Sequence, residues 1–229
     1  MSGTHRPPIG RALCLGVDAE ADARAFAALA SERGFDAPAL LLGEGGTLAA
    51  VRAKLAEMAA ISEPGDLFLL TFSGHGGRTK RRGPAGESRE VGFWQLLDGT
   101  LNDEQLKAEL VCFRPGVRVL VVSDNCGGGV PSLRPSQLDT SLSASVLVLA
   151  ACQEGKCADG AGLPGHFTRA LTGVLNGAGL GGAFGRACSR TYSQFHEALC
   201  TRMPDYQKPD FYRVGAIDAA FETQEPFSI

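Results

Sequence analysis

Short runs of continuously hydrophobic residues alternate along this chain with amphipathic segments. Within the runs, polar residues do not occupy every second position, a pattern typical of parallel strands that are covered on both faces of a sheet. The runs predict buried strands over residues 11–17, 37–42, 66–72, 117–123 and 144–151.

The segments between these runs have helical periodicity. Residues 20–33 place apolar side chains along one face, as expected of a helix packed on a sheet. Thr47 is positioned to cap a helix that extends to Ser62. A further helix is predicted to begin at Asn102 or Asp103. Strands and helices therefore alternate through the first half of the chain.

The same alternation continues toward the C-terminus. Helical patterns cover residues 164–177 and 191–203, and residues 210–217 can form a final strand. This order predicts an α/β fold in which helices cover both faces of a mostly parallel sheet. We expect a three-layer α/β/α sandwich with a central sheet of about six strands, forming a single domain over residues 1–229.

Two segments lack this periodicity, and both directly follow predicted strands. Residues 76–92 are rich in Gly and Arg, and residues 127–143 are rich in Gly, Pro and Ser. The basic run at residues 78–82 is interpreted as a solvated loop. Ligands of open α/β sheets bind at the carboxyl ends of the strands, so these two segments are the expected location of a site.

Composition and charge narrow the classes of function. The chain is 44% hydrophobic with a net charge of −3, which favours neither nucleic acid nor a membrane surface as a partner. No run reaches the roughly 18 apolar residues of a transmembrane helix, and no signal-peptide core is evident. The seven cysteines are odd in number and scattered, so no disulfide framework is expected. A reducing cytoplasm fits these features.

A histidine and a cysteine follow two of the predicted strands. His75 and Cys126 each lie beside glycines, which allow the backbone to turn sharply. If the two strands are neighbours, both side chains face one crevice, where a thiolate can attack a carbonyl and an imidazolium can protonate the leaving amine. The glycines can present N–H groups to the developing oxyanion. This pair predicts acyl transfer.

Each residue alone has an ordinary structural explanation. A lone cysteine in an α/β core is usually a small hydrophobic residue, and a lone histidine is usually a satisfied structural group. The combination favours catalysis, because His75 lies 51 residues before Cys126, a separation close to the ~50 residues found in caspases.

With these two motifs in view, the sequence resembles the caspase-like cysteine peptidases, in particular the metacaspases and their prokaryotic relatives, the orthocaspases. The segment FSGHGG at 72–77 resembles the histidine motif of the family, and SDNCGGG at 123–129 resembles its cysteine motif. The chain departs from the family pattern at Asn125, which precedes the cysteine, and at Gly127 and Gly128, where His and Ser are usual. The likeness spans nearly the whole chain.

The resemblance implies a caspase–haemoglobinase fold and a division of the domain. Residues 1–129 resemble the large-subunit region, residues 130–145 form a short linker loop, and residues 146–229 resemble the small-subunit region. It also implies that Cys126 is the nucleophile and His75 the base, with the N–H groups of Gly76 and Cys126 forming the oxyanion hole.

The resemblance further implies a substrate preference. Asp22, Ser73 and Asp124 match the family positions that line the pocket for the residue before the cleaved bond. Two carboxylates in a cleft favour a basic side chain, and arginine can bind them bidentately. We therefore expect protein or peptide substrates that are cleaved after Arg or Lys. The alternatives are a helix first-turn charge for Asp22 and a turn-forming residue for Asp124.

The resemblance also carries expectations about calcium binding and oligomeric state. No cofactor is expected, although many metacaspases bind Ca²⁺ after the histidine loop, where Asp98, Asp103 and Glu104 are the candidates here. Asp103 and Glu104 are equally well explained as charges at a helix N-terminus. A monomer is expected, with a dimer as the alternative.

Two other functions compete with a peptidase. One is a catalytically silent caspase-like domain that serves as an interaction module, although such domains usually lose the cysteine or the histidine. The other is a cysteine amidase or thioesterase, but the residues around Cys126 do not form the G-x-C/S-x-G elbow of such enzymes. The sequence thus favours a peptidase over both.

Overall fold

The computed structural model describes residues 6–82, 88–125, 141–151, 165–177 and 191–229. Its centre is a six-stranded sheet in the order β2-β1-β3-β7-β8-β9, in which every neighbouring pair is parallel except β8 and β9. This confirms the expected mostly parallel sheet. The strands are β1 (Gly10–Val17), β2 (Ala39–Leu42), β3 (Leu67–Gly74), β7 (Arg118–Asn125), β8 (Ser145–Ala150) and β9 (Asp210–Gly215).

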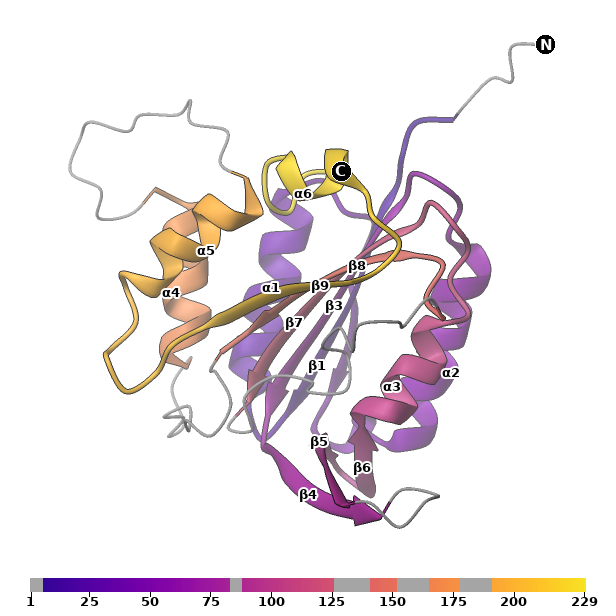
Figure 1. Ribbon diagram of the computed structural model, residues 1–229, viewed down its shortest axis with the longest axis vertical. Coiled ribbons are helices and arrows are strands. Elements are labelled where there is room, and N and C mark those ends of the chain that lie inside the picture. Colours follow the sequence, from indigo (N-terminus) through magenta and orange to yellow (C-terminus); the bar gives the residue numbers. More distant parts are fainter. Residues whose placement is uncertain (1–5, 83–87, 126–140, 152–164, 178–190) are drawn as a thin grey trace.

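Helices cover both faces of this sheet, which confirms the three-layer sandwich (Figure 1). Two of the helices pack on one face with one hydrophobic core, and the other four pack on the opposite face with a second core. The first face carries α2 (Leu48–Ile61) and α3 (Asp103–Leu110). The second carries α1 (Glu20–Glu32), α4 (His166–Leu175), α5 (Tyr192–Cys200) and α6 (Ala219–Thr223).

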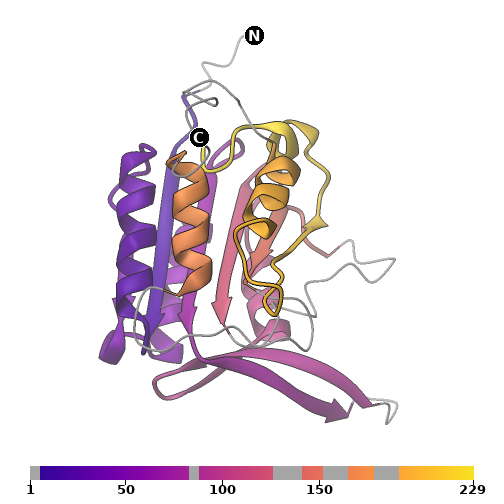
Figure 2. The ribbon, with the colours of Figure 1, turned by 90° about the vertical axis from the view of Figure 1, so that its left-hand side faces the viewer.

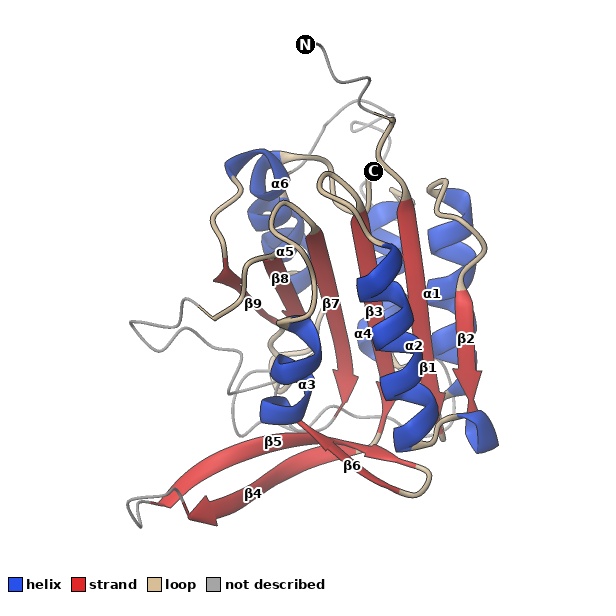
Figure 3. Ribbon diagram, turned by 90° about the vertical axis from the view of Figure 1, so that its right-hand side faces the viewer, coloured by secondary structure: helices blue, strands red, loops and turns tan. Residues whose placement is uncertain are grey.

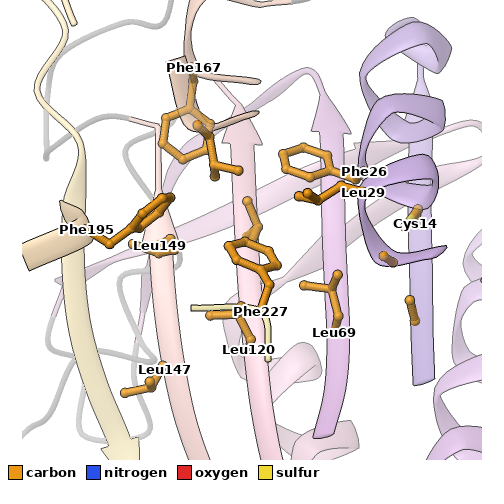
Figure 4. Close-up of a cluster of buried hydrophobic side chains, with 14 of the residues drawn as sticks. Cys14, Phe26, Leu29, Leu69, Leu120, Leu147, Leu149, Phe167, Phe195 and Phe227 are labelled. Carbon is orange, nitrogen blue, oxygen red and sulfur yellow. The ribbon is translucent and has the colours of Figure 1, made fainter. Parts of the chain in front are cut away.

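The second core is rich in phenylalanine. Phe26 of α1, Phe167 of α4 and Phe195 of α5 point toward sheet leucines such as Leu69 and Leu120, and all five side chains are buried (Figure 4). Burial of each such side chain contributes about 1.5–3 kcal/mol. This packing fixes α1 and α4 against the same strands, and therefore against each other. Among the described residues, no helix is long and apolar enough to cross a membrane.

The predicted helix starts are confirmed by their capping bonds. The Thr47 hydroxyl accepts a hydrogen bond from the Ala50 N–H at 3.2 Å. Asn102 begins α3 with a capping box, in which its side chain accepts from the Gln105 N–H and the Gln105 side chain accepts from the Asn102 N–H. Such caps contribute about 1 kcal/mol each.

The prediction that residues 76–92 are irregular is wrong. Residues 76–82 and 88–92 belong to a second sheet of three antiparallel strands, β4 (Gly76–Arg82), β5 (Ser88–Leu96) and β6 (Gly99–Asn102), with β5 in the middle. A short 3-10 helix, η1 (Gly43–Gly45), lies between β2 and α2. Figures 2 and 3 show the small sheet at the end of the sandwich where the parallel strands finish.

The basic run at 78–82 is therefore an exposed edge strand and not a loop. The glycines and basic residues of β4 have low strand propensity, so the sequence pattern did not indicate a strand here. Pairing with β5, which buries Val91 and Trp94, holds β4 in place. Charged residues are common on edge strands because they discourage pairing with other chains.

Asp66 ties the N-terminal segment to the end of the sheet. Its side chain is 1% exposed and accepts hydrogen bonds from Arg6 and Arg11, and from the N–H groups of Ile9 and Glu63. Burial alone would raise the pKa of Asp66, but these hydrogen bonds lower it well below its usual range. The carboxylate is thus more stable when the protein is folded.

We expect Asp66→Ala to lower the free energy of unfolding by about 3 kcal/mol, because half-buried Arg11 loses its carboxylate partner. The lowered pKa means that this contribution is present above the unfolded-state pKa of about 3.9 and is lost as the pH falls below it. Urea unfolding at pH 7 and pH 3 measures both effects. Glu225→Ala, which removes the exposed partner of Arg33, is the control and should cost less than about 1 kcal/mol. Equal losses for the two variants would contradict the prediction.

Candidate active site

The strand register brings the two sequence motifs side by side. Gly74 at the end of β3 lies opposite Asn125 at the end of β7, and the two strands are parallel neighbours. The next residue along one strand is His75, and the next along the other is Cys126. Cys126 lies outside the described residues. Adjacent strands are about 4.8 Å apart, so β3 and β7 end side by side at the same edge of the sheet.

Two glycines allow the backbone around His75 to come this close. Gly74 has φ +157°, and a Cβ there would meet the Val17 carbonyl oxygen at 2.5 Å. A Cβ on Gly76 would overlap the Asn125 side chain. The histidine segment therefore packs directly on the residue that precedes Cys126. His75 itself is exposed, and its carbonyl accepts a hydrogen bond from the Gln95 N–H at 2.8 Å.

Trp94 of β5 anchors the small sheet under the ends of β3 and β7. Its indole stacks on Phe72, with ring centroids 4.7 Å apart and an interplanar angle of 9°. Its Nε1–H donates to the Ser123 hydroxyl at 2.9 Å. Trp94 was missed by sequence reasoning, although it is the chain's single tryptophan, because its partners are set by the tertiary fold. It fixes the strand that pairs with Gly76.

Two acidic residues meet on the other face of the same sheet edge. Asp22 lies in the first turn of α1 and Asp124 near the end of β7, and both are buried. The N–H of Gly165 donates to Asp22 Oδ1 at 2.9 Å, and a Cβ on Gly165 would lie 3.1 Å from Asp124 Oδ2. The Thr168 hydroxyl donates to that same Oδ2 at 2.7 Å. The first turn of α4 thus contacts both carboxyl groups.

Burial raises the pKa values of both acids. Burial raises the pKa of Asp124 to about 7; the hydrogen bond from Thr168 opposes this shift and the negative charge of Asp22 adds to it. Burial also raises the pKa of Asp22, against the opposing effects of the Gly165 N–H, the Thr168 hydroxyl and the positive charge of Arg169. A cation placed beside the pair would favour the ionised form of both.

Ser73 lies beside this pair. It is opposite Asp124 in the strand register and is fully buried. Among the described residues, its hydroxyl has no hydrogen-bond partner. A buried polar group without a partner costs free energy, and at this position a polar ligand group could satisfy it. The structure thus brings together the three residues, Asp22, Ser73 and Asp124, that the sequence grouped by resemblance.

The calcium candidates make separate contacts. Asp98 Oδ1 accepts from the Leu48 N–H at 2.8 Å, Asp103 Oδ2 accepts from the Gly92 N–H at 3.0 Å, and Glu104 pairs with Arg81 at 3.7 Å. Within the described ranges, no three His, Cys, Asp or Glu residues are grouped as a metal would require. Asp103 and Glu104 lie in the first turn of α3, where they favourably oppose the helix dipole.

The fold and this sheet edge define an α/β/α protein in which His75 follows β3, and Asp124, near the end of the adjacent parallel strand β7, lies close to Asp22 of α1. The family model of the caspase domain matches residues 17–216, and the chain belongs to this family. The expected membership of the caspase-like family is thereby confirmed. No curated protein matches the chain.

Two solved structures are similar to the chain. The chain is similar to a Geobacter sulfurreducens protein, a structural genomics target, with 30% identity and a TM-score of 0.80, over 97% of this chain and 99% of that one. It is also similar to caspase-1 from Spodoptera frugiperda, with 13% identity and a TM-score of 0.52, over 90% of this chain and 86% of that one. The second similarity is one of fold.

Proposed function

We propose that the protein is a cysteine endopeptidase that uses His75 and Cys126 as a catalytic dyad and cleaves peptide bonds after arginine or lysine. The observation that carries the proposal is the pairing of Gly74 with Asn125, because these two residues immediately precede the histidine and the cysteine on adjacent strands. Membership of the caspase-domain family supports it.

The proposed chemistry is acyl transfer in two steps. The Cys126 thiolate attacks the substrate carbonyl carbon, and the oxyanion accepts hydrogen bonds from the N–H groups of Gly76 and Cys126. The His75 imidazolium then gives its proton to the leaving amine as the C–N bond breaks, which leaves a thioester. Water, deprotonated by His75, hydrolyses the thioester and releases the new carboxyl terminus and the free thiol.

The acidic pair supplies the proposed specificity. Asp22 and Asp124 are buried, share the contacts of Gly165 and Thr168, and disfavour each other's negative charge. A guanidinium or ammonium group of the substrate would relieve this repulsion, and a substrate carboxylate would increase it. The Ser73 hydroxyl can accept a hydrogen bond from the same basic group.

Fluorogenic peptides that differ only in the residue before the cleaved bond test the proposal. The arginine and lysine peptides should be cleaved, and the aspartate peptide should not. An arginine-containing peptidyl electrophile should label Cys126 in a reaction that needs His75. Preferential cleavage after aspartate would overturn the specificity. The absence of both cleavage and labelling would overturn the peptidase and favour a silent interaction module, and hydrolysis of simple amides alone would favour an amidase.

The acidic pair predicts a pH dependence that is separable from that of the dyad. With the pKa of Asp124 at about 7, protonation below that pH removes charge from the pocket. We expect kcat/KM for an arginine peptide, relative to the neutral isostere citrulline, to fall by up to about tenfold per pH unit below 7. Asp22 and Arg169 are the other charged groups that act on the pair.

The ratio of the two substrates cancels the ionisation of His75 and Cys126, since both substrates use the same dyad. Initial-rate measurements between pH 5 and pH 9 on the two peptides suffice. A ratio that does not change with pH would contradict the prediction.

A further inference from the structure

The first turn of α4 connects the two acidic residues. Gly165 is the N-terminal cap of this ten-residue helix, and its N–H donates to Asp22. Thr168 lies one turn further on and is 1% exposed. Its hydroxyl donates a hydrogen bond to Asp124, which lies 44 residues earlier in the sequence. Neither residue belongs to the histidine or cysteine motif. A single helical turn therefore holds one oxygen of each carboxyl group.

These hydrogen bonds bear on how the acids can bind a cation. A carboxylate held at one oxygen has a fixed plane, and its other oxygen has a fixed direction. The Thr168 hydroxyl also stabilises the ionised forms of Asp124 and Asp22, since it lowers the pKa of each against the effect of burial. Without this donor, a buried carboxylate would rotate toward another partner or take up a proton.

We propose that Thr168 is a positioning residue for recognition of the substrate's basic side chain: with the N–H of Gly165, its hydroxyl orients the Asp22–Asp124 pair and keeps it ready to accept hydrogen bonds from a guanidinium or ammonium group. This inference rests on the proposed function, in which the acidic pair selects arginine or lysine. Thr168 acts through Asp124 and not on the reacting atoms.

Three substitutions on one helix separate this role from a structural one. Thr168→Val has nearly the same shape, so it removes the hydroxyl and keeps the packing. Thr168→Ser keeps the hydroxyl and loses a methyl group. Thr172→Val is the matched control, because the Thr172 hydroxyl donates to the Thr168 carbonyl at 2.8 Å, a local helical contact.

The substitutions should affect ground-state recognition of the basic residue. For Thr168→Val, we expect kcat/KM on an arginine peptide to fall about tenfold to hundredfold, mainly through KM. The citrulline peptide should be affected much less, and the acid limb of the arginine-to-citrulline ratio should move to higher pH. Thr168→Ser should restore most of the loss, and Thr172→Val should behave as wild type.

A direct titration distinguishes failure of this inference from failure of the proposed function. Carbon-13 NMR of the aspartate carboxyl groups follows Asp22 and Asp124 without any substrate, and Thr168→Val should raise the Asp124 midpoint while Thr172→Val leaves it unchanged. If wild type cleaves after neither arginine nor lysine, the proposed function fails, and the inference, which rests on it, fails as well.

If wild type does cleave after arginine, the inference stands or falls on its own results. It is overturned if Thr168→Val leaves KM, the pH limb and the carboxyl midpoint as in wild type. It is also overturned if Thr168→Ser loses as much activity as Thr168→Val, since the hydroxyl then does not matter. A loss on both peptides to the same extent points to general disturbance of α4 and overturns it too.

Discussion

His75→Ala and Cys126→Ala should each lower kcat/KM on an arginine peptide by a factor on the order of 10⁴ or more, because each removes one half of the proposed dyad. Without Cys126, the acyl-enzyme cannot form. Without His75, the leaving amine has no proton donor. The two residues act as a unit, so the double variant should be no less active than either single variant.

Steady-state rates at equal total protein concentration check this prediction, with circular dichroism to confirm that the variants fold. Two thiols of the described ranges serve as controls. Cys112 is exposed, and Cys14 is buried, with a pKa raised to about 11 by burial. Cys112→Ala should keep full activity, and the peptidyl electrophile should not label either residue. A multiplicative loss in the double variant, or an active His75→Ala, would contradict the dyad.

The four parallel strands at the heart of the sheet could be predicted because both of their faces are buried. A strand such as β3 or β8 has no exposed side, so its sequence is hydrophobic throughout and is recognisable without its neighbours. The caps at Thr47 and Asn102 are equally local, since donor and acceptor lie three residues apart. Local chemistry therefore accounts for most of the sandwich.

The small sheet could not be predicted because contacts between residues distant in sequence hold its strands together. β4 consists of glycine, threonine and cations, and only its pairing with β5 makes it a strand. Trp94 holds β5 through Ser123, which lies 29 residues away along the chain. No pattern within either segment specifies that contact.

The candidate site likewise contains residues that the sequence predicted and one that it did not. His75, Asp22, Ser73 and Asp124 were found through motifs, and the structure brings the last three together at the strand ends. Thr168 was not found. Its helix was recognised from the apolar stripe, but a threonine beside that stripe gives no sign that it faces an aspartate 44 residues away.

The second large expected effect concerns Asp124. Asp124→Asn keeps the shape of the side chain and an acceptor for the Thr168 hydroxyl, but it removes the charge. Removing one partner of a buried, hydrogen-bonded charge pair costs roughly 2–5 kcal/mol, so kcat/KM on the arginine peptide should fall on the order of a hundredfold to a thousandfold. The citrulline peptide should change far less. Asp22→Asn should act in the same direction.

Asp103→Asn provides the matched control for the specificity effect. Asp103 is as deeply buried as Asp124 and likewise accepts a hydrogen bond, from the Gly92 N–H, but it lies at the start of α3 on the other face of the sheet. Its replacement should leave the arginine-to-citrulline ratio unchanged. If Asp103→Asn and Asp124→Asn alter the ratio equally, the acidic pair does not determine specificity.

Asp124→Asn should also make the protein more stable, which a purely structural aspartate would not do. The folded-state pKa of about 7 lies above the unfolded value of about 3.9, so the folded protein binds the proton more tightly. Stability is therefore lost as the pH rises from about 4 to about 7, and the cost persists above that range. The asparagine variant avoids a cost on the order of a few kcal/mol at pH 8.

Urea unfolding of wild type and Asp124→Asn at pH 5 and pH 8 measures this difference in stability. Lower activity together with higher stability at pH 8 would mark Asp124 as a residue retained for binding a cation at the expense of the fold, and a destabilised variant at pH 8 would contradict that role.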